Sequence, residues 1–483
     1  MAHSRQIPKT ASNGFDEPLT FEVWIGTSHV ADLIDRGAGS TSEWELAYTP
    51  DWDASPRAFA LSPALPLGRR HAGTVVSNFF ENFLPEGEAL AELRRTVRLD
   101  RKNAVGMAYA LRDDLPGAIA LRAGRREEDG KDERGEEGDE PLSELERANV
   151  FRPITDEELL DRLRGFAPIT VWDNRFRLTV AGVQRKLTVM RRDGAWGLAE
   201  GPDWASTHIV KFASEEMPML VLNEYLTMRL AALSGFPTAK VRMVDIGGRE
   251  GVRALEVERF DRLWRPDLGR EGTVLRTHVI DACQATGLSV ARKYEQPYGS
   301  GRDVAHIRDG VSWPLVTDLV ASAEDPQRFL VFLWSAFVFN LIVGNSDAHG
   351  KNWSFFVTAK GLRPTPLYDL VNVAVLRDTL APQLDTRLAM TVGDAFERDR
   401  VSVEDWILLG VDCDFPLERI HECLGRVTGK VAGALDAVGK EVETLSLRDD
   451  EVKFASAWRR SVEEGLAIAR RWADDIERVL LRS

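Results

Sequence analysis

Residues 341–356 begin at the end of a long apolar run. Within the six positions 347–352, this segment contains Asp347, His349, Lys351 and Asn352. In phosphoryl-transfer enzymes of the catalytic-loop type, an aspartate orients and deprotonates the acceptor hydroxyl, and an asparagine five residues later binds Mg²⁺. Asp347 and Asn352 have this spacing. The segment therefore predicts a phosphoryl-transfer loop.

A second acid follows this loop at the distance of one hairpin. Asp369 comes after the strand-like stretch Trp353 to Val357 and a proline-containing turn. With Asn352 it would complete a pair of oxygen ligands for Mg²⁺. Aspartate and asparagine also populate ordinary polar turns through local hydrogen bonds. The joint spacing of Asp347, Asn352 and Asp369 favours the metal-dependent site over that alternative.

Composition and charge limit the class of protein. The 483 residues are 44% hydrophobic and 29% charged, which suits a globular chain with two or three cores. Residues 1–19 lack an apolar signal segment, and the apolar run 329–344 is too short to span a bilayer. Three cysteines without a Cys-x-x-Cys pair indicate neither a disulfide framework nor a zinc site. We expect a cytoplasmic protein without membrane attachment, whose net charge of −14 disfavours direct contact with DNA.

One segment is too polar to form a core. Residues 124–140 contain nine acidic and four basic residues and no apolar side chain. We expect a flexible linker over residues 124–148, although an acidic interaction segment is a second interpretation.

The positions of predicted strands and helices divide the rest of the chain. Residues 1–123 predict a small α+β subdomain with strands at 19–25, 44–48, 58–61 and 118–122 and a helix at 78–97. Residues 149–265 predict a β-rich lobe: a helix at 156–163, strands at 177–180, 186–191, 195–198 and 208–211 with an Asp193-Gly194 hairpin turn, a helix at 220–233, and strands at 240–245 and 254–258. Residues 266–483 predict an α-helical lobe with helices at 279–287, 318–322, 329–343, 403–410, 417–427 and 450–481.

This order predicts an α+β, bilobal, protein-kinase-like fold with a β-rich N-terminal lobe and an all-α C-terminal lobe. The predicted catalytic loop begins in the helical lobe. A cleft between two such lobes suits ATP.

Lys211, at the end of a predicted strand, is the candidate cation for the ATP phosphates. Glu224, on the next helix, has the spacing to form an ion pair with it. An exposed lysine and an exposed helix glutamate are the alternatives.

A turn and a strand end are candidates for the rest of the nucleotide site. The turn from Thr179 to Lys186 has small residues, one glycine, and Gln184 and Lys186 as donors, so it could cover phosphates. No P-loop motif is present in the sequence. At the end of the last strand of the β-rich lobe, Phe260 could contact adenine or belong to the core.

The pattern resembles the HipA-type serine/threonine kinases, the toxin components of bacterial toxin–antitoxin pairs. The resemblance covers most of the chain. It rests on segments that occur jointly and in order: 78–87, 116–121, 180–187, 208–211, 223–225, 257–262, 283–285, 344–352 and 368–370.

The resemblance implies roles for individual residues. Asp347 would be the catalytic base, and Asn352 and Asp369 would bind Mg²⁺. Lys211 would contact the ATP phosphates. The other nucleotide-binding residues would be Ala181, Gly182, Val183, Gln184, Arg185 and Lys186 over the phosphates, Glu258, Arg259 and Phe260 at adenine, and His349, Lys351 and Tyr368.

The resemblance also implies regulation and partners. The family phosphorylates a serine just before the phosphate loop, and here Thr179 has that place. A phosphate at Thr179 would repel ATP from the loop, while the branched side chain restricts its rotamers. The expected target is a translation component such as an aminoacyl-tRNA synthetase, whose modification would arrest growth. The expected partner is a small helix-turn-helix antitoxin, which would make DNA contact indirect.

Two other functions keep some of these features. A lipid or small-molecule kinase has a similar loop, although no basic or amphipathic membrane-binding segment is evident. A non-catalytic co-repressor scaffold would bind the antitoxin without needing Asp347, Asn352, Asp369 and Lys211 together.

Overall fold

The computed structural model describes residues 20–36, 43–97, 103–111, 114–124, 148–165, 168–173, 175–176, 184–248 and 251–482. Most of the predicted linker and the predicted strand at 177–180 lie outside these ranges. The chain divides into two compact units. The first unit comprises Met1–Ile209 and Asp261–Val279, and the second comprises Val210–Phe260 and Ile280–Ser483. The four-part division drawn from the sequence stays a prediction.

The first unit begins with an antiparallel five-stranded sheet in the order β4-β3-β2-β1-β5. Its strands are β1 (Thr20–Ile25), β2 (Ser28–Asp35), β3 (Trp44–Tyr48), β4 (His71–Ala72) and β5 (Ile119–Ala123). Alternate residues of β3 are buried, namely Trp44, Leu46 and Tyr48, as a sheet with one covered face requires. The helices of this part are α1 (Pro50–Asp53), α2 (Thr74–Glu81), α3 (Gly87–Val97) and α4 (Ala104–Ala110).

Two sequence predictions in this part are wrong. No strand forms at 58–61, because the Leu61 N–H donates to the Tyr48 hydroxyl at 2.8 Å instead of to a neighbouring strand. The helix expected over 78–97 is two helices, α2 and α3, interrupted before Pro85; a helix usually ends before a proline. The sequence prediction also missed β2, which follows a tight turn at Gly26 with φ of 59°.

The remainder of the first unit carries shorter strands. It contains β6 (Val150–Pro153), α6 (Asp156–Leu163), β7 (Val171–Trp172), β8 (Arg175–Phe176), β9 (Lys186–Arg192), β10 (Ala195–Glu200), β14 (Arg262–Arg265) and β15 (Thr273–Arg276). α6 has the predicted bounds, and a capping box between Thr155 and Glu158 fixes its start. The predicted hairpin between β9 and β10 is confirmed, with positive φ at both Asp193 and Gly194. Strands β11 (His208–Phe212) and β16 (Val279–Asp281) lie where the chain passes between units.

The second unit combines two antiparallel hairpins with many helices. β12 (Val241–Ile246) pairs with β13 (Val252–Glu258), and β17 (Ser354–Thr358) pairs with β18 (Gly361–Pro364). Helix α7 (Leu220–Leu233) has the predicted bounds and is buried on most sides. The other helices are α8 (Ala282–Thr286), α9 (Trp313–Asp318), α10 (Pro326–Ile342), α11 (Val373–Thr379), α12 (Val403–Asp412), α13 (Leu417–Thr444) and α14 (Asp449–Leu480). The predicted α+β class is confirmed.

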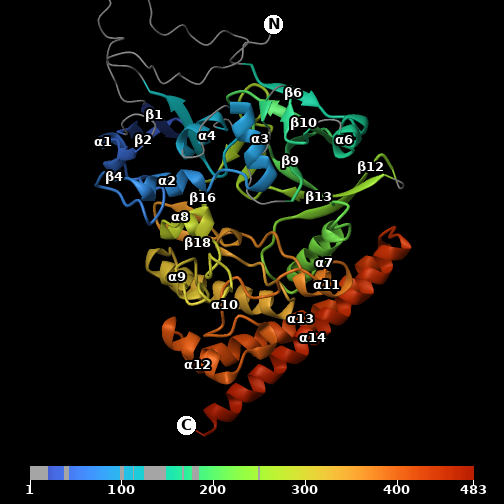
Figure 1. Cartoon of the computed structure of the whole chain (residues 1–483). Coiled ribbons are helices and arrows are strands. Elements are labelled where there is room, and N and C mark those ends of the chain that lie inside the picture. Colours follow the sequence, from blue (N-terminus) through green and yellow to red (C-terminus); the bar gives the residue numbers. More distant parts are fainter. Residues whose placement is uncertain are drawn as a thin grey trace, which may run out of the picture. The chain divides into compact units, whose positions relative to one another are not determined.

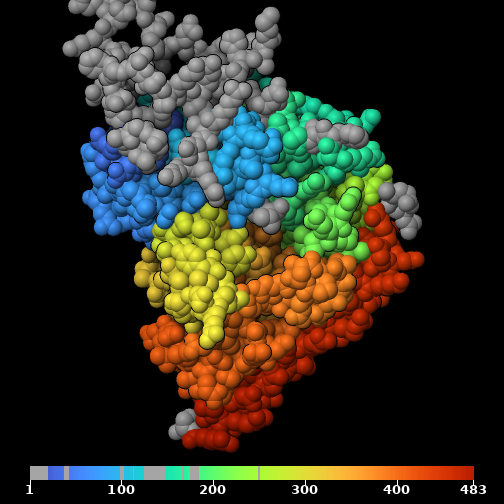
Figure 2. Space-filling model, in the orientation of Figure 1, coloured from blue at the N-terminus to red at the C-terminus, as the bar shows by residue number. Residues whose placement is uncertain are grey.

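Helix α10 is the apolar centre of this unit. Asp325 caps its N-terminus and Pro326 occupies the first turn. It contacts α13 and α14, which are amphipathic and pack against each other (Figure 1). In Figure 2, α14 (red) extends along one side of the unit with one face open to solvent. In the ranges that the structure describes, no helix combines the length and the apolar character needed to span a membrane.

Candidate active site

The loop that carries Asp347 is fixed to the end of α10. Asn345 bonds back to Asn340 twice, from its backbone N–H to the Asn340 carbonyl (2.9 Å) and from Nδ2 to Oδ1 (2.7 Å). Gly344 has φ of 68°, and a Cβ there would lie 3.0 Å from the Ala374 Cβ. A left-handed, crowded position favours glycine. The sharp turn therefore sets where the loop begins.

Asp347 is held from two directions. Tyr294 donates its hydroxyl to Asp347 Oδ1 at 2.7 Å. Asn352, in the 3₁₀ turn Gly350–Asn352, donates its side-chain NH₂ to the Asp347 carbonyl at 3.0 Å. This bond uses the amide nitrogen of Asn352, so its amide oxygen is the atom suited to a metal ion. The spacing of five residues thus corresponds to a real contact between the two residues.

Lys211 is buried between two carboxylates of the second unit. Its Nζ lies 2.6 Å from Glu224 Oε1 on α7 and 2.6 Å from Asp369 Oδ1. Burial disfavours the charged form, but the negative charges of Asp369 and Glu224 outweigh burial and raise the Lys211 pKa above its ordinary value. Lys211 is therefore a fixed cation. The ion pair with Glu224, one of two interpretations of the sequence, is confirmed.

Asp369 differs from Glu224 in exposure and backbone conformation. Its side chain is 39% exposed, whereas that of Glu224 is 1% exposed. Its φ of 55° lies in the left-handed region that non-glycine residues rarely adopt. Strained backbone of this kind concentrates at functional sites. Asp369 therefore presents a carboxylate that Lys211 orients and that a ligand can still approach.

His349 and Lys351 are buried residues of this same loop. Burial, with nearby Lys293, lowers the pKa of His349 to about 3, so the imidazole is neutral at pH 7. Its ring meets that of Tyr294 edge-on at 5.1 Å. Lys351 forms a 2.7 Å ion pair with Asp281, the residue that caps α8. These contacts attach the loop that carries Asp347 to the surrounding residues of the second unit.

Aromatic residues flank Asp369. Tyr368 donates its hydroxyl to the Lys351 carbonyl at 2.6 Å, and burial raises its pKa above the ordinary value. The Phe260 ring lies 5.5 Å from that of Tyr368 and 5.8 Å from that of Phe356. Phe260 therefore packs in one aromatic group with Tyr368, the residue that precedes Asp369.

The remaining predicted nucleotide residues are only partly described. Glu258 pairs with Lys240 at 3.1 Å, and Arg259 is buried. Arg185 is exposed and donates to the Leu163 carbonyl at 3.3 Å, while Lys186 is buried and Gln184 half-buried, all in the first unit. Thr179, Ala181, Gly182 and Val183 lie outside the described residues.

The oxygen donors suit a hard divalent cation. Asp347 and Asp369 supply carboxylates and Asn352 an amide oxygen, the ligand types that Mg²⁺ prefers. No group of three or more His, Cys, Asp or Glu side chains with metal-binding geometry occurs among the described residues.

Sequence reasoning missed two residues of this site. Tyr294 lies 53 positions before Asp347, and Asp281 lies 70 positions before Lys351. No motif or periodicity connects either pair. Only the tertiary structure could identify them.

Comparisons with known proteins find similar chains. Residues 21–122 match the model of the HipA N-terminal domain, and residues 178–435 match that of the HipA-like C-terminal domain. The chain is 34% identical over 443 residues to the serine/threonine-protein kinase toxin HipA of Shewanella oneidensis, covering 91% of this chain and 94% of that protein. It is also similar to the HipA chain in a solved complex of HipA, HipB and operator DNA from Shewanella oneidensis MR-1. That match has a TM-score of 0.78 and 33% identity, and covers 95% of this chain and 99% of the other.

Proposed function

The chain belongs to the HipA family of serine/threonine-protein kinase toxins, and on this premise we propose that it transfers the γ-phosphoryl group of ATP to a protein hydroxyl and thereby arrests growth. The observation that carries the proposal is the ion pair of Lys211 with Glu224, at 2.6 Å, beside Asp369. Active protein kinases require this type of pair between a strand lysine and a helix glutamate, next to a metal-binding aspartate.

We assign each residue a role from its contacts. Asp347 accepts the proton of the attacking hydroxyl, and its bonds with Tyr294 and Asn352 fix its orientation. Lys211 neutralises phosphate charge. Asn352 and Asp369 would hold Mg²⁺, which would neutralise negative charge on the ATP phosphates.

The nucleotide would be held by further residues. Residues 181–186 cover the phosphates in this proposal, and Glu258, Arg259 and Phe260 hold adenine. His349, Lys351 and Tyr368 contact other protein groups of the site. We assign them to positioning the loop and Asp369.

The substrate and partners follow from the family. We propose a translation component such as an aminoacyl-tRNA synthetase as the target, and Thr179 as a site of autophosphorylation. The Shewanella HipA chain was solved together with HipB and operator DNA. This supports a small helix-turn-helix antitoxin as a partner, with DNA contacted through it. A cytoplasmic location stays a prediction.

Mass spectrometry of the purified chain tests the proposal. Wild type, Asp347→Asn and the control Asp303→Asn, an exposed aspartate of the same unit, are incubated with Mg²⁺ and ATP. ADP release and added phosphate are recorded with and without bacterial lysate. We expect both signals in wild type and control and neither in Asp347→Asn.

The outcomes separate the alternatives. If phosphate appears on Thr179 in wild type and in the control, but not in Asp347→Asn, the result supports autophosphorylation. ATP turnover with Thr179 unmodified rejects autophosphorylation. Transfer to a lipid or metabolite, with no protein modified, supports the small-molecule kinase. No transfer by protein that binds Mg²⁺·ATP overturns the kinase proposal in favour of the scaffold.

A further inference from the structure

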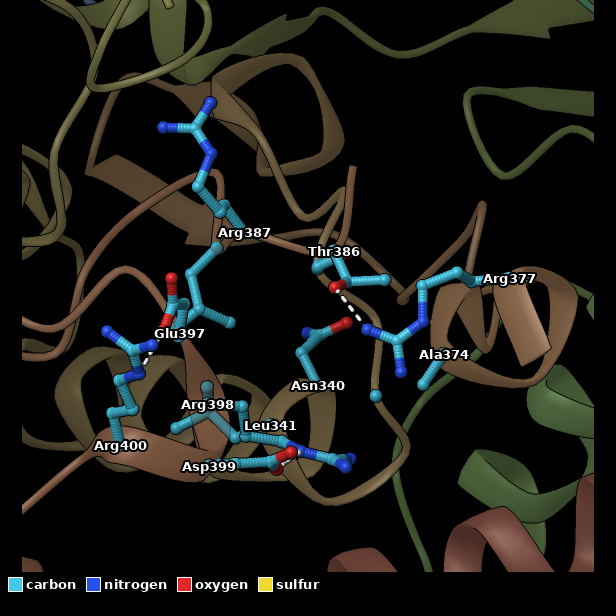
Figure 3. Close-up of a pocket in the computed structure, with 13 residues that line it drawn as sticks. Asn340, Leu341, Ala374, Arg377, Thr386, Arg387, Glu397, Arg398, Asp399 and Arg400 are labelled. Carbon is cyan, nitrogen blue, oxygen red and sulfur yellow. Dashed lines mark hydrogen bonds and ion pairs between the residues drawn. The ribbon is translucent and has the colours of Figure 1, made fainter. Parts of the chain in front are cut away.

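An arginine-lined cavity lies within the second unit, next to the start of the catalytic loop. Figure 3 shows its lining residues. Its volume is about 330 Å³, within the range of pockets that hold small molecules. None of the residues assigned above to ATP or Mg²⁺ lines it. The lining residues come from the end of α10, from α11 and from the segments 386–388 and 397–400.

The lining of this cavity is rich in arginine. Four arginines, Arg377, Arg387, Arg398 and Arg400, are accompanied by only two acidic residues, Glu397 and Asp399. The whole chain has a net charge of −14. The concentration of arginines is therefore local to this cavity and does not follow from the general composition. Each of the four forms an ion pair with an acidic residue, namely Asp378, Asp385, Asp399 or Glu397.

Arg398 is the most informative of the four. Its side chain is only 13% exposed and forms one ion pair, with Asp399 at 3.2 Å. Among the described residues its buried Nη1 has no hydrogen-bond partner. A buried charged N–H without an acceptor is costly. Nη1 itself is packed against protein, so the guanidinium would have to turn toward the cavity for this N–H to donate to an anion there.

Arg377 is oriented by its neighbours. It donates from Nη1 to Thr386 Oγ1 at 2.9 Å and from Nε to Asp378 at 2.9 Å. In Figure 3 its guanidinium points toward Asn340 and the centre of the cavity, whereas Arg387 points away from it. Arg377 and Arg398 are therefore the two cations best placed to meet a ligand.

The other ion pairs at the rim do not neutralise this pair of cations strongly. Arg387 is paired with Asp385 and Arg400 with Glu397, and Asp378 is 53% exposed. Exposed ion pairs are weak and exchange readily with other anions. A doubly charged ligand can therefore compete with Asp378 for Arg377.

We infer that this cavity binds the phosphate group of a small phosphate-bearing molecule, at a site separate from the proposed ATP site. Guanidinium groups match phosphate oxygens in pairs of parallel hydrogen bonds. The volume leaves room for a phosphate with an attached organic group. Gly344 and Ser346 also line the cavity, so the ligand would contact the segment that leads to Asp347.

Calorimetric titration of the full chain with inorganic phosphate and pyrophosphate tests this site. A non-hydrolysable ATP analogue with Mg²⁺ is present at saturation, so that the proposed ATP site is blocked. The test variants are Arg377→Ala and Arg398→Gln, singly and together. Arg363→Ala, an exposed arginine of the same unit whose partner is Glu324, is the matched control. Circular dichroism confirms that each variant is folded.

We expect saturable binding of pyrophosphate to wild type and to Arg363→Ala, and binding weaker by roughly tenfold or more in the double variant. Equal affinity in all folded variants, or no binding by wild type, overturns the inference. Binding of a phosphoserine peptide without binding of either inorganic ion would assign the cavity to a modified chain and overturn the small-molecule ligand. This experiment measures binding, so its result does not depend on whether the kinase proposal is correct.

Discussion

The Tyr294 hydroxyl donates to Asp347 Oδ1 at 2.7 Å, so the proposed catalytic base carries a hydrogen bond from a residue 53 positions earlier in the chain. The bond occupies one carboxylate oxygen and leaves the carboxyl group in a defined orientation. The Gly350 N–H also donates to the Lys293 carbonyl at 2.8 Å. The segment around Tyr294 thus braces the catalytic loop at two points.

Replacing Tyr294 by phenylalanine tests this brace. A hydrogen bond to a charged group is worth roughly 1.5 to 3 kcal/mol, and a less ordered base spends less time in a productive orientation. We expect Tyr294→Phe to lower kcat about tenfold with the KM for ATP unchanged, in steady-state assays of ADP release. An increase in kcat would show instead that Tyr294 blocks the position of the acceptor hydroxyl.

Removing Lys211 should destabilise the second unit as well as abolish activity. Lys211→Met leaves Glu224 buried without its cation, and breaking a buried ion pair costs about 3 to 5 kcal/mol. Adding Glu224→Leu removes that charge. We expect the double variant to recover most of the lost free energy of unfolding in urea titrations while kinase activity stays absent. Recovery of activity with stability would mean that Lys211 has only a structural role.

Asp369→Asn should weaken the use of Mg²⁺. Asparagine tolerates the left-handed backbone of this position better than alanine does, and its amide oxygen can still accept from Lys211. Because one negative charge is lost from the proposed metal site, we expect the Mg²⁺ concentration for half-maximal activity to rise about tenfold. Initial rates over a Mg²⁺ series, beside Asp303→Asn, measure this. An unchanged Mg²⁺ dependence would remove Asp369 from the metal site.

The first unit should lose stability in mild acid through His278. Burial lowers the pKa of this imidazole to about 4, and its Nε2 bonds to the Leu61 carbonyl at 2.9 Å. Because the folded pKa is below the unfolded value, the stabilisation is complete above about pH 6.5 and is lost as the pH falls toward 4. The shift corresponds to a loss of up to about 3 kcal/mol.

Urea titrations at pH 7.5 and pH 5 measure this dependence. We expect the wild type to lose more stability between these values than His278→Gln, which has no titrating imidazole. The His349 contribution is common to both proteins and cancels in the comparison. Equal losses in the two proteins would contradict the role of His278.

Short-range sequence patterns were sufficient for several elements. The bounds of α6 and α7 and the turn at Asp193 and Gly194 were predicted as the structure has them. Each depends on residues within one or two turns of chain. The resemblance to HipA-type kinases, which rests on short segments in a fixed order, is also confirmed.

Predictions failed where distant groups decide the local structure. The segment 58–61 is not a strand, because Tyr48 binds its backbone. Helix α13 continues to Thr444, well past the predicted end at 427, because its apolar face packs against α10 and α14. Propensity and periodicity are properties of a short window, so they contain no information about such partners.

The sequence by itself determined which residue types could do chemistry and how Asp347 and Asn352 are spaced, because both lie in one short loop. The tertiary structure decided which distant residues join them. Lys211 and Asp369 are 158 positions apart, yet their charged atoms lie 2.6 Å apart. The fold brings together β11, α7 and the segment after β18, and the attraction between opposite charges in a buried place then fixes the contact. Short sequence windows contain the information for local structure, whereas the packing of the fold decides which distant residues meet.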